Sequence, residues 1–184
     1  MRRGAVKRIT AWLLLTALLV LPAAIVAAAE RPGKAAIASA HFMATEAGHE
    51  ILAQGGNAFD AAIAVAAALA VVEPTSSGIG GGGFWLLHRA EDGFQVMVDS
   101  REKAPAAAHR DMYLDEDGAV NRDLAINGPL AGGIPGEVAG FEHIARQYGR
   151  LPLSVSLQPA IRIARDGFEV DEKFARLMGW RVDQ

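Results

Sequence analysis

The hydrophobic and polar positions after residue 34 predict a first pair of helices. From Ala44 to Gln54 apolar side chains recur at helical spacing with polar ones opposite them, and Gly55-Gly56 ends the pattern. From Ala58 to Val72 nearly every side chain is apolar, which is typical of a helix buried on all sides. Asn57 and Asp60 form a capping-box pattern at its start, with Asp in place of the usual Glu or Gln.

Shorter apolar segments predict strands. Ala35–Ala40 suits a short buried strand. Phe84–Arg89 and Phe94–Ser100 predict a hairpin, because Asp92-Gly93 between them is a strong turn signal. The second of these strands delivers its end, and Arg101 just beyond it, to one edge of the sheet.

The second half of the chain predicts loops followed by helices. Residues 104–134 are loop-rich, whereas residues 137–148 predict one helix, the segment from Ser154 or Ser156 to Arg165 a second, and the segment from Asp171 the start of a third. Strands and helices in a chain of this length indicate one domain of the α/β (α+β) class.

Residues 1–29 have the three zones of a secretory signal peptide. A basic start precedes the apolar run Ala11–Val26, and three small alanines then predict cleavage after Ala29. An uncleaved membrane anchor is the alternative, because the apolar run is just long enough to span a bilayer. Pro22 and the alanine-rich end favour cleavage. We therefore expect a mature domain of residues 30–184 that is periplasmic or secreted.

Composition and charge exclude several classes of function. The formal charge is −3, and removal of residues 1–29, which carry four basic and no acidic side chains, lowers it to −7. Such a chain, without any basic run, disfavours a nucleic-acid partner. The absence of cysteine excludes disulfides, zinc–thiolate sites and thiol nucleophiles. The histidines lack metal-ligand spacing, so the sequence predicts neither a metal nor a cofactor.

Four consecutive glycines, Gly80–Gly83, are the most unusual local feature. Such a run is entropically unfavourable, so it indicates a close backbone approach or a positive φ. A phosphate-binding loop does not fit, because no Lys-Ser/Thr follows and the run precedes a strand rather than a helix. A structural role and a place beside a ligand both stay open from the residues alone.

Arg101 is the candidate binding residue. Strand ends are common positions for ligand-binding groups, and a guanidinium suits a carboxylate because its planar fork donates two parallel hydrogen bonds. A solvated surface arginine paired with Glu102 is the alternative, and the residues alone favour it. Ser76-Ser77 has no assignable base, and no Gly-x-Ser-x-Gly pattern supports a serine triad.

Six segments carry short patterns of glycine, proline and charged residues whose order and spacing can be compared with those of known families. They are Gly-Gly-Asn-Ala-Phe-Asp-Ala-Ala within Gln54–Ala62, the glycine run with Phe84, Asp-Ser-Arg-Glu-Lys-Ala-Pro at Asp99–Pro105, Gly-Ile-Pro-Gly-Glu-Val-Ala-Gly-Phe at Gly133–Phe141, Pro159-Ala160, and Ala-Arg-Asp-Gly-Phe at Ala164–Phe168. Each pattern alone is weak. In this order and spacing they resemble the gamma-glutamyltransferase family, also called gamma-glutamyltranspeptidase or glutathione hydrolase, over essentially residues 34–168.

The resemblance implies part of an N-terminal-nucleophile hydrolase fold, a four-layer αββα sandwich, and a precursor that cuts itself into a large and a small subunit. This chain corresponds to the N-terminal portion of the large subunit. The N-terminal threonine of the small subunit would attack the gamma-glutamyl amide of glutathione or a related donor, and water or an amino acid or peptide acceptor would resolve the resulting ester. Arg101 matches the family arginine that binds the α-carboxylate of the glutamyl group.

The same resemblance places the nucleophile beyond Gln184. We therefore expect no catalytic residue in this chain, and no activity from residues 1–184 alone. Two alternatives stay open. One is a related acylase of the glutaryl or cephalosporin type, in which the arginine would still bind a carboxylate. The other is a catalytically inactive fragment that binds carboxylates.

Overall fold

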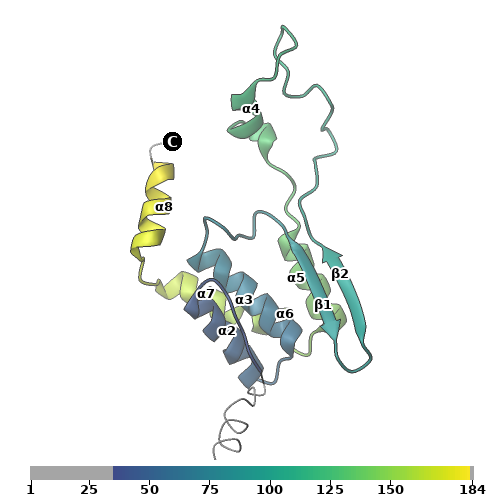
Figure 1. Ribbon diagram of the computed structural model, residues 1–184, viewed down its shortest axis with the longest axis vertical. Helices are drawn as coiled ribbons and strands as arrows, with labels where there is room; N and C mark the ends of the chain where they lie inside the picture. The colour runs from purple at the N-terminus through teal and green to yellow at the C-terminus, as the bar shows by residue number, and fades with distance from the viewer. Residues whose placement is uncertain (1–34, 183–184) are drawn as a thin grey trace, which may run out of the picture. The chain divides into compact units, whose positions relative to one another are not determined.

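The computed structural model describes residues 35–182, and the predicted signal peptide lies outside them. Helices α2 (Phe42–Ala53) and α3 (Ala58–Val72) come first, followed by strands β1 (Phe84–Arg89) and β2 (Phe94–Asp99) (Figure 1). The later elements are α4 (Arg122–Ile126), the 3-10 turn η1 (Pro129–Ala131), α5 (Glu137–Tyr148), α6 (Leu153–Ser156), α7 (Gln158–Asp166) and α8 (Glu172–Val182). Within the described range, no helix is long and apolar enough to cross a membrane.

Helix α3 is the centre of the core, as its apolar sequence predicts. It contacts α2, α5, α6 and α7, and its Ile63, Ala64 and Ala68 are fully buried. Small side chains allow a close approach between helices. A Cβ at Gly48 on α2 would lie 2.7 Å from Val65 on α3, so a larger residue at this position would force the two helices apart.

The start of α3 is fixed by a network of hydrogen bonds. The side chain of Asn57 accepts from the amides of Phe59 and Asp60, and the buried Asp60 carboxylate accepts from the Asn57 amide at 2.8 Å, which confirms the predicted capping box. Asp60 also accepts from the Arg150 amide at 3.0 Å, while Asn57 Nδ2 donates to Tyr148 O at 2.7 Å. The network therefore ties the start of α3 to the end of α5.

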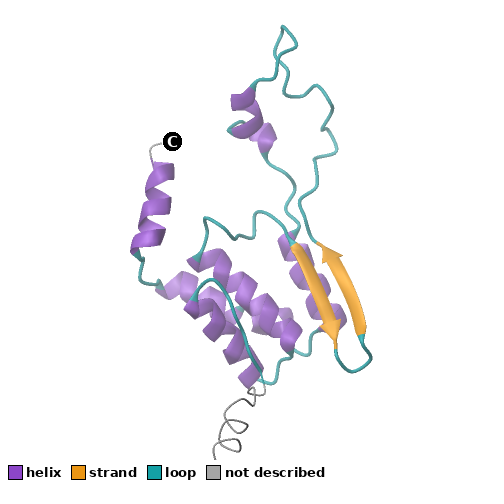
Figure 2. Ribbon diagram, viewed as in Figure 1, coloured by secondary structure: helices purple, strands orange, loops and turns teal. Residues whose placement is uncertain are grey.

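Strands β1 and β2 form the predicted antiparallel hairpin, with Phe84 opposite Asp99 and Arg89 opposite Phe94 (Figure 2). Gly93 in the connecting turn has a φ of +72°, a left-handed conformation that glycine adopts without steric cost. The predicted turn signal is therefore confirmed, and the second strand ends one residue earlier than expected.

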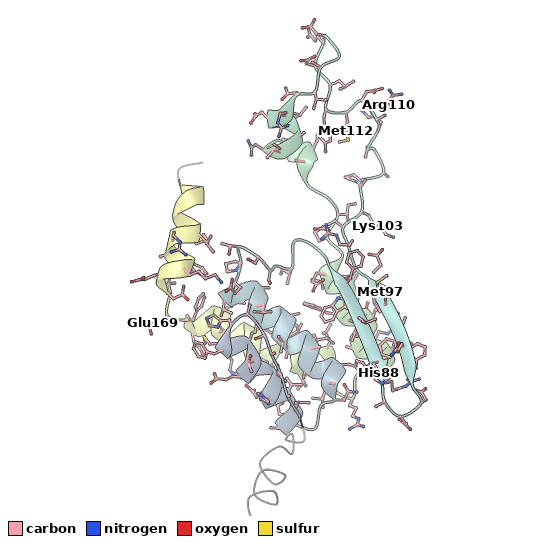
Figure 3. All side chains as sticks on the ribbon, in the orientation of Figure 1. His88, Met97, Lys103, Arg110, Met112 and Glu169 are labelled. Atoms are coloured by element: carbon pink, nitrogen blue, oxygen red, sulfur yellow. The ribbon has the colours of Figure 1, made fainter. Side chains whose placement is uncertain are left out.

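The hairpin has one covered and one open face, because successive strand side chains point to opposite sides. The side chains that pack on the helical core are Trp85, Leu87, Val96 and Val98. The opposite face mixes polar side chains with exposed apolar ones: Leu86 is 82% exposed and Met97, labelled in Figure 3, is 63% exposed.

Two predicted elements are wrong in detail. Ala35–Ala40 is not a strand: within the described part of the chain no strand pairs with it, and its Ile37 lies against Gly48 instead. A short apolar run does not by itself distinguish a strand from another packed segment. The predicted helix up to Arg165 is broken at Leu157, where α7 restarts with Pro159 in its first turn.

Residues 104–133 leave the hairpin region and return to the same point. Lys103 N donates to Ile134 O at 3.1 Å and Ile134 N donates to Lys103 O at 2.8 Å, which closes the base of this excursion (Figure 3). The segment is loop-rich, as the sequence predicts, and its short regular elements are α4 and η1. Asn121 caps α4 by accepting from Leu124 N at 3.0 Å.

Candidate functional site

Arg101 lies two residues beyond the last residue of β2, at the sheet edge where the sequence predicts it. Ser100 N donates to Gly83 O at 3.0 Å and Gly83 N donates to Ser100 O at 3.3 Å, which extends the strand pairing past β2. The Arg101 amide then donates to Asp99 Oδ1 at 3.0 Å, a local turn that leads the chain away from the sheet.

The glycine run lies against this strand end because it lacks side chains. A Cβ at Gly82 would lie 2.1 Å from Ser100 O and 2.8 Å from Arg101 Cα. A Cβ at Gly136, just before α5, would lie 2.3 Å from the same carbonyl oxygen. No glycine of Gly80–Gly83 has a positive φ, so close backbone approach is the reason for glycine at position 82.

The Arg101 side chain lies between two clefts and is 53% exposed. One cleft, of about 400 Å³, is lined by the loop of residues 74–82 and Glu102. The other, of about 460 Å³, is lined by the end of β2 and the start of α5. Arg101 Nη1 donates to Gly82 O at only 3.4 Å, so the guanidinium retains donors for a ligand.

Glu102 neutralises Arg101 without satisfying its hydrogen bonds. Glu102 Oε2 lies 3.2 Å from Arg101 Nε, yet this buried oxygen accepts no hydrogen bond from any residue that the structure describes. The two charges are therefore close but misaligned, since a hydrogen bond needs the N–H to point at its acceptor. The surface pair that the sequence suggested is present, and it leaves both partners incompletely bonded.

A buried polar cluster behind the arginine is the part of the site that the sequence did not reveal. Ser100 is 5% exposed, and its Oγ accepts from Trp85 Nε1 at 3.1 Å. Gly83 O at 3.0 Å and Glu137 Oε2 at 3.2 Å are both acceptors for the Ser100 hydroxyl. Burial raises the pKa of Glu137 and the charge of Glu102 raises it further, whereas hydrogen bonds from Ser100 and Trp85 lower it.

Other candidate chemistry is not assembled in the described residues. Ser76 and Ser77 line the same cleft as Arg101, but no histidine or lysine lines it to act as a base. Between residues 35 and 182, no group of three or more histidine, aspartate or glutamate side chains is placed to hold a metal ion. The arrangement around Arg101 can bind an anionic group, and a guanidinium is chemically matched to a carboxylate.

Comparison with known proteins decides the family. A family model described as Gamma-glutamyltranspeptidase matches residues 44–184. The glutathione hydrolase proenzyme of Escherichia coli (strain K12) is 47% identical over 139 residues, which cover 76% of this chain and 24% of that protein. The chain belongs to the gamma-glutamyltranspeptidase family.

Solved structures show the fold to which this chain belongs. The Helicobacter pylori gamma-glutamyltranspeptidase matches with a TM-score of 0.78 and 42% identity, over 82% of this chain and 43% of that one. A cephalosporin acylase from Bacillus halodurans matches with a TM-score of 0.65 and 30% identity, over 84% of this chain and 31% of that one. The chain has part of the mixed helix-and-strand N-terminal-nucleophile hydrolase fold, and it spans about a quarter of the length of the curated relatives.

Proposed function

We propose that this chain is the N-terminal part of the large subunit of an enzyme that cleaves gamma-glutamyl amides such as glutathione. Curated relatives named glutathione hydrolase proenzyme support this reaction class. The observation that carries the proposal is the placement of Arg101, whose backbone is fixed by Asp99 while its half-exposed guanidinium faces a cleft with donors to spare.

Arg101 would bind the α-carboxylate of the glutamyl group with two parallel charge-assisted hydrogen bonds. This binding fixes the amino-acid end of the donor, so that its γ-carbonyl carbon is presented to the nucleophile at a lower entropic cost. The nucleophile is proposed to be the N-terminal threonine of the small subunit, with its own α-amine as the base. The hydroxyl oxygen bonds to the carbonyl carbon, the amide C–N bond breaks, and the leaving amine takes the proton.

The resulting glutamyl ester is resolved by water or by the amine of an amino acid or peptide acceptor, which regenerates the threonine. All of these steps lie outside the described residues. The part that belongs to this chain is recognition of the donor.

Replacement of Arg101 in the complete proenzyme tests the proposal. Arg101→Gln removes the charge and the fork, and we expect the KM for a gamma-glutamyl chromogenic amide to rise about a hundredfold, the loss of roughly two charge-assisted hydrogen bonds. Arg101→Lys keeps a charge without the fork, so a smaller rise is expected. An unchanged KM in both variants would refute the proposal.

A related acylase of the glutaryl or cephalosporin type is the second candidate, favoured by the likeness to the cephalosporin acylase. Glutaryl and gamma-glutamyl donors share the carboxylate and differ in the α-amine. We expect faster turnover of the gamma-glutamyl amide by the complete enzyme. Preference for the glutaryl amide would support the acylase instead.

The small subunit of the same precursor is the proposed partner of this chain. The open hairpin face supports this, because its exposed apolar side chains Phe84, Leu86 and Met97 are ones that a partner would cover. Because the proposed nucleophile belongs to the small subunit, purified residues 1–184 should not turn over a gamma-glutamyl chromogenic amide. A cooperative melt together with carboxylate binding by residues 1–184 would favour the inactive binding fragment.

The proposed location is periplasmic or extracellular, and it rests on the signal-peptide pattern of residues 1–29. N-terminal sequencing of exported protein should give a mature chain that begins at Glu30. A mature chain that still begins at Met1 or Arg2 would contradict cleavage.

A further inference from the structure

A buried hydroxyl links the strand end to helix α5. Ser100 Oγ has one proton and two lone pairs. It accepts from Trp85 Nε1 at 3.1 Å, and its proton has two acceptors in reach, Gly83 O at 3.0 Å and Glu137 Oε2 at 3.2 Å. An ionised Glu137 competes with Gly83 for this proton. A protonated Glu137 can donate to the second lone pair of Ser100, which leaves the serine proton to Gly83.

Glu137 also holds the glycine run through its backbone. Its amide donates to Gly81 O at 3.1 Å, beside the Gly136 amide, which donates to the same oxygen at 3.0 Å. Arg101 Nη1 donates to the following carbonyl, Gly82 O, at 3.4 Å. The position of the guanidinium therefore depends on two segments, its own strand end and the glycine run. Glu137 is hydrogen-bonded to both, through its side chain to Ser100 and through its amide to Gly81.

Helix α5 lies directly against the strand end at Ser100 and the glycine run. Glu137 begins the helix and is half-buried, at a position where the helix dipole favours a negative or hydrogen-bond-accepting group. One turn later, a Cβ at Gly140 would lie 2.8 Å from the Cβ of Ser100. The contact between Glu137 and Ser100 is therefore built into the packing of the helix on the strand end.

We propose that Glu137 is a positioning residue for Arg101. It joins the Ser100 side chain to the glycine run, and so sets where the guanidinium stands in its cleft without contacting the donor itself. The inference rests on the proposed role of Arg101 in carboxylate binding. Loss of Glu137 should raise the KM of donors that carry the α-carboxylate and leave kcat nearly unchanged.

The test is a double-mutant cycle in the complete proenzyme, with Glu137→Leu, Arg101→Gln and both together. The KM for a gamma-glutamyl chromogenic amide should rise about fivefold in Glu137→Leu, the scale of one lost hydrogen bond, with kcat changed less than about twofold. In the Arg101→Gln background the same change should add less than about twofold, because the guanidinium it positions is gone. Glu137→Gln, which keeps an acceptor and a donor, should restore the parental KM.

Glu142→Leu is the matched control, since Glu142 is exposed on the same helix and pairs only with Arg146 at 3.2 Å among the described residues. It should leave the KM unchanged. Losses from Glu137→Leu and Arg101→Gln that multiply fully would overturn the inference, as would an equal loss with the 4-aminobutyryl amide, which lacks the α-carboxylate.

If Glu137→Leu does not mature, Ser100→Ala removes the same link with less change in volume and should show the same donor-selective rise. A Ser100→Ala enzyme with parental KM would also overturn the inference. An Arg101→Gln enzyme with parental KM would refute the proposed function instead, so the two failures are distinguishable.

Discussion

Asp60 and Glu102 are carboxylates that lie beside turns of the chain, and their surroundings differ in the number of donors. Asp60 is fully buried and accepts from the backbone amides of Asn57 and Arg150 at 2.8 and 3.0 Å. Glu102 lies beside Arg101, and its buried Oε2 accepts no hydrogen bond within the described residues. The Asp60 carboxylate therefore accepts hydrogen bonds from its own backbone on both sides, whereas Glu102 Oε2 accepts none within the described residues.

The difference separates a folding device from a binding site. A fully buried carboxylate with several backbone donors stabilises the join between two helices and is out of reach of a ligand. A half-exposed arginine that meets a glutamate without aligned hydrogen bonds retains donors that a ligand can use. Changes near Asp60 should therefore affect stability, and changes near Arg101 should affect donor binding.

The largest loss of stability is expected from Gly82→Ala, which places a methyl group against the backbone of the Arg101 segment. The new Cβ would lie 2.1 Å from Ser100 O, so the segment must shift, at a cost of about 3 kcal/mol or more. We expect little mature enzyme and at least about a tenfold loss of kcat/KM in what remains. Gly80→Ala is the matched control, because its Cβ meets nothing within 4 Å; equal behaviour of the two variants would contradict the close-approach argument.

A smaller loss of stability, without any loss of donor binding, is expected from Asp60→Ala. Loss of the carboxylate leaves the amides of Asn57 and Arg150 without their acceptor, at a cost of about 2 kcal/mol. The melting temperature of the complete enzyme should fall, while the donor KM stays unchanged. Glu91→Ala, at an exposed turn position, should leave the melting temperature unchanged. A raised donor KM in Asp60→Ala with an unaltered melting temperature would break the comparison.

Asp92 gives the smallest effect, from a third kind of carboxylate that is exposed but aligned with its own arginine. The hydrogen bond from Arg89, at 2.6 Å, and that from the Phe94 amide lower the pKa of Asp92 from 3.8 to about 2. Because folding lowers the pKa of Asp92, its ionised carboxylate stabilises the folded state. This stabilisation is present above pH 3.8 and is lost as the pH falls through about 2. In Arg89→Gln, an NMR titration should show the Asp92 pKa closer to its ordinary value; a pKa still near 2 would contradict the assignment.

The predictable parts of the fold are those whose signals are local. The cap at Asn57 and Asp60, the Asp92-Gly93 turn and the apolar α3 sequence each act within a few residues, and each is confirmed. The Ala35–Ala40 strand failed because an apolar run does not specify a pairing partner. The break at Leu157 depends on packing that no local pattern encodes.

The candidate site also has parts that local sequence predicts and parts that it does not. The glycine run and the strand-end position of Arg101 are visible in one sequence, but the residues alone favour a surface pair with Glu102. Carboxylate binding by Arg101 comes from the family resemblance and stays a prediction. The contact of Ser100 with Glu137 joins positions 37 residues apart, and the contact of Ser100 with Trp85 crosses the hairpin, so neither follows from local spacing. The Pro-Gly-Glu segment at the start of α5 is the signal that the sequence offers, since the amides of Gly136 and Glu137 both donate to the glycine run.

The most direct test compares two donors in the complete enzyme: a gamma-glutamyl chromogenic amide and the 4-aminobutyryl amide, which is the same molecule without its α-carboxylate. The parental enzyme should prefer the first by about a hundredfold in kcat/KM, and Arg101→Gln should reduce that preference to near unity. A preference that survives intact in Arg101→Gln would show that the carboxylate is bound elsewhere, and that Arg101 is a surface residue paired with Glu102.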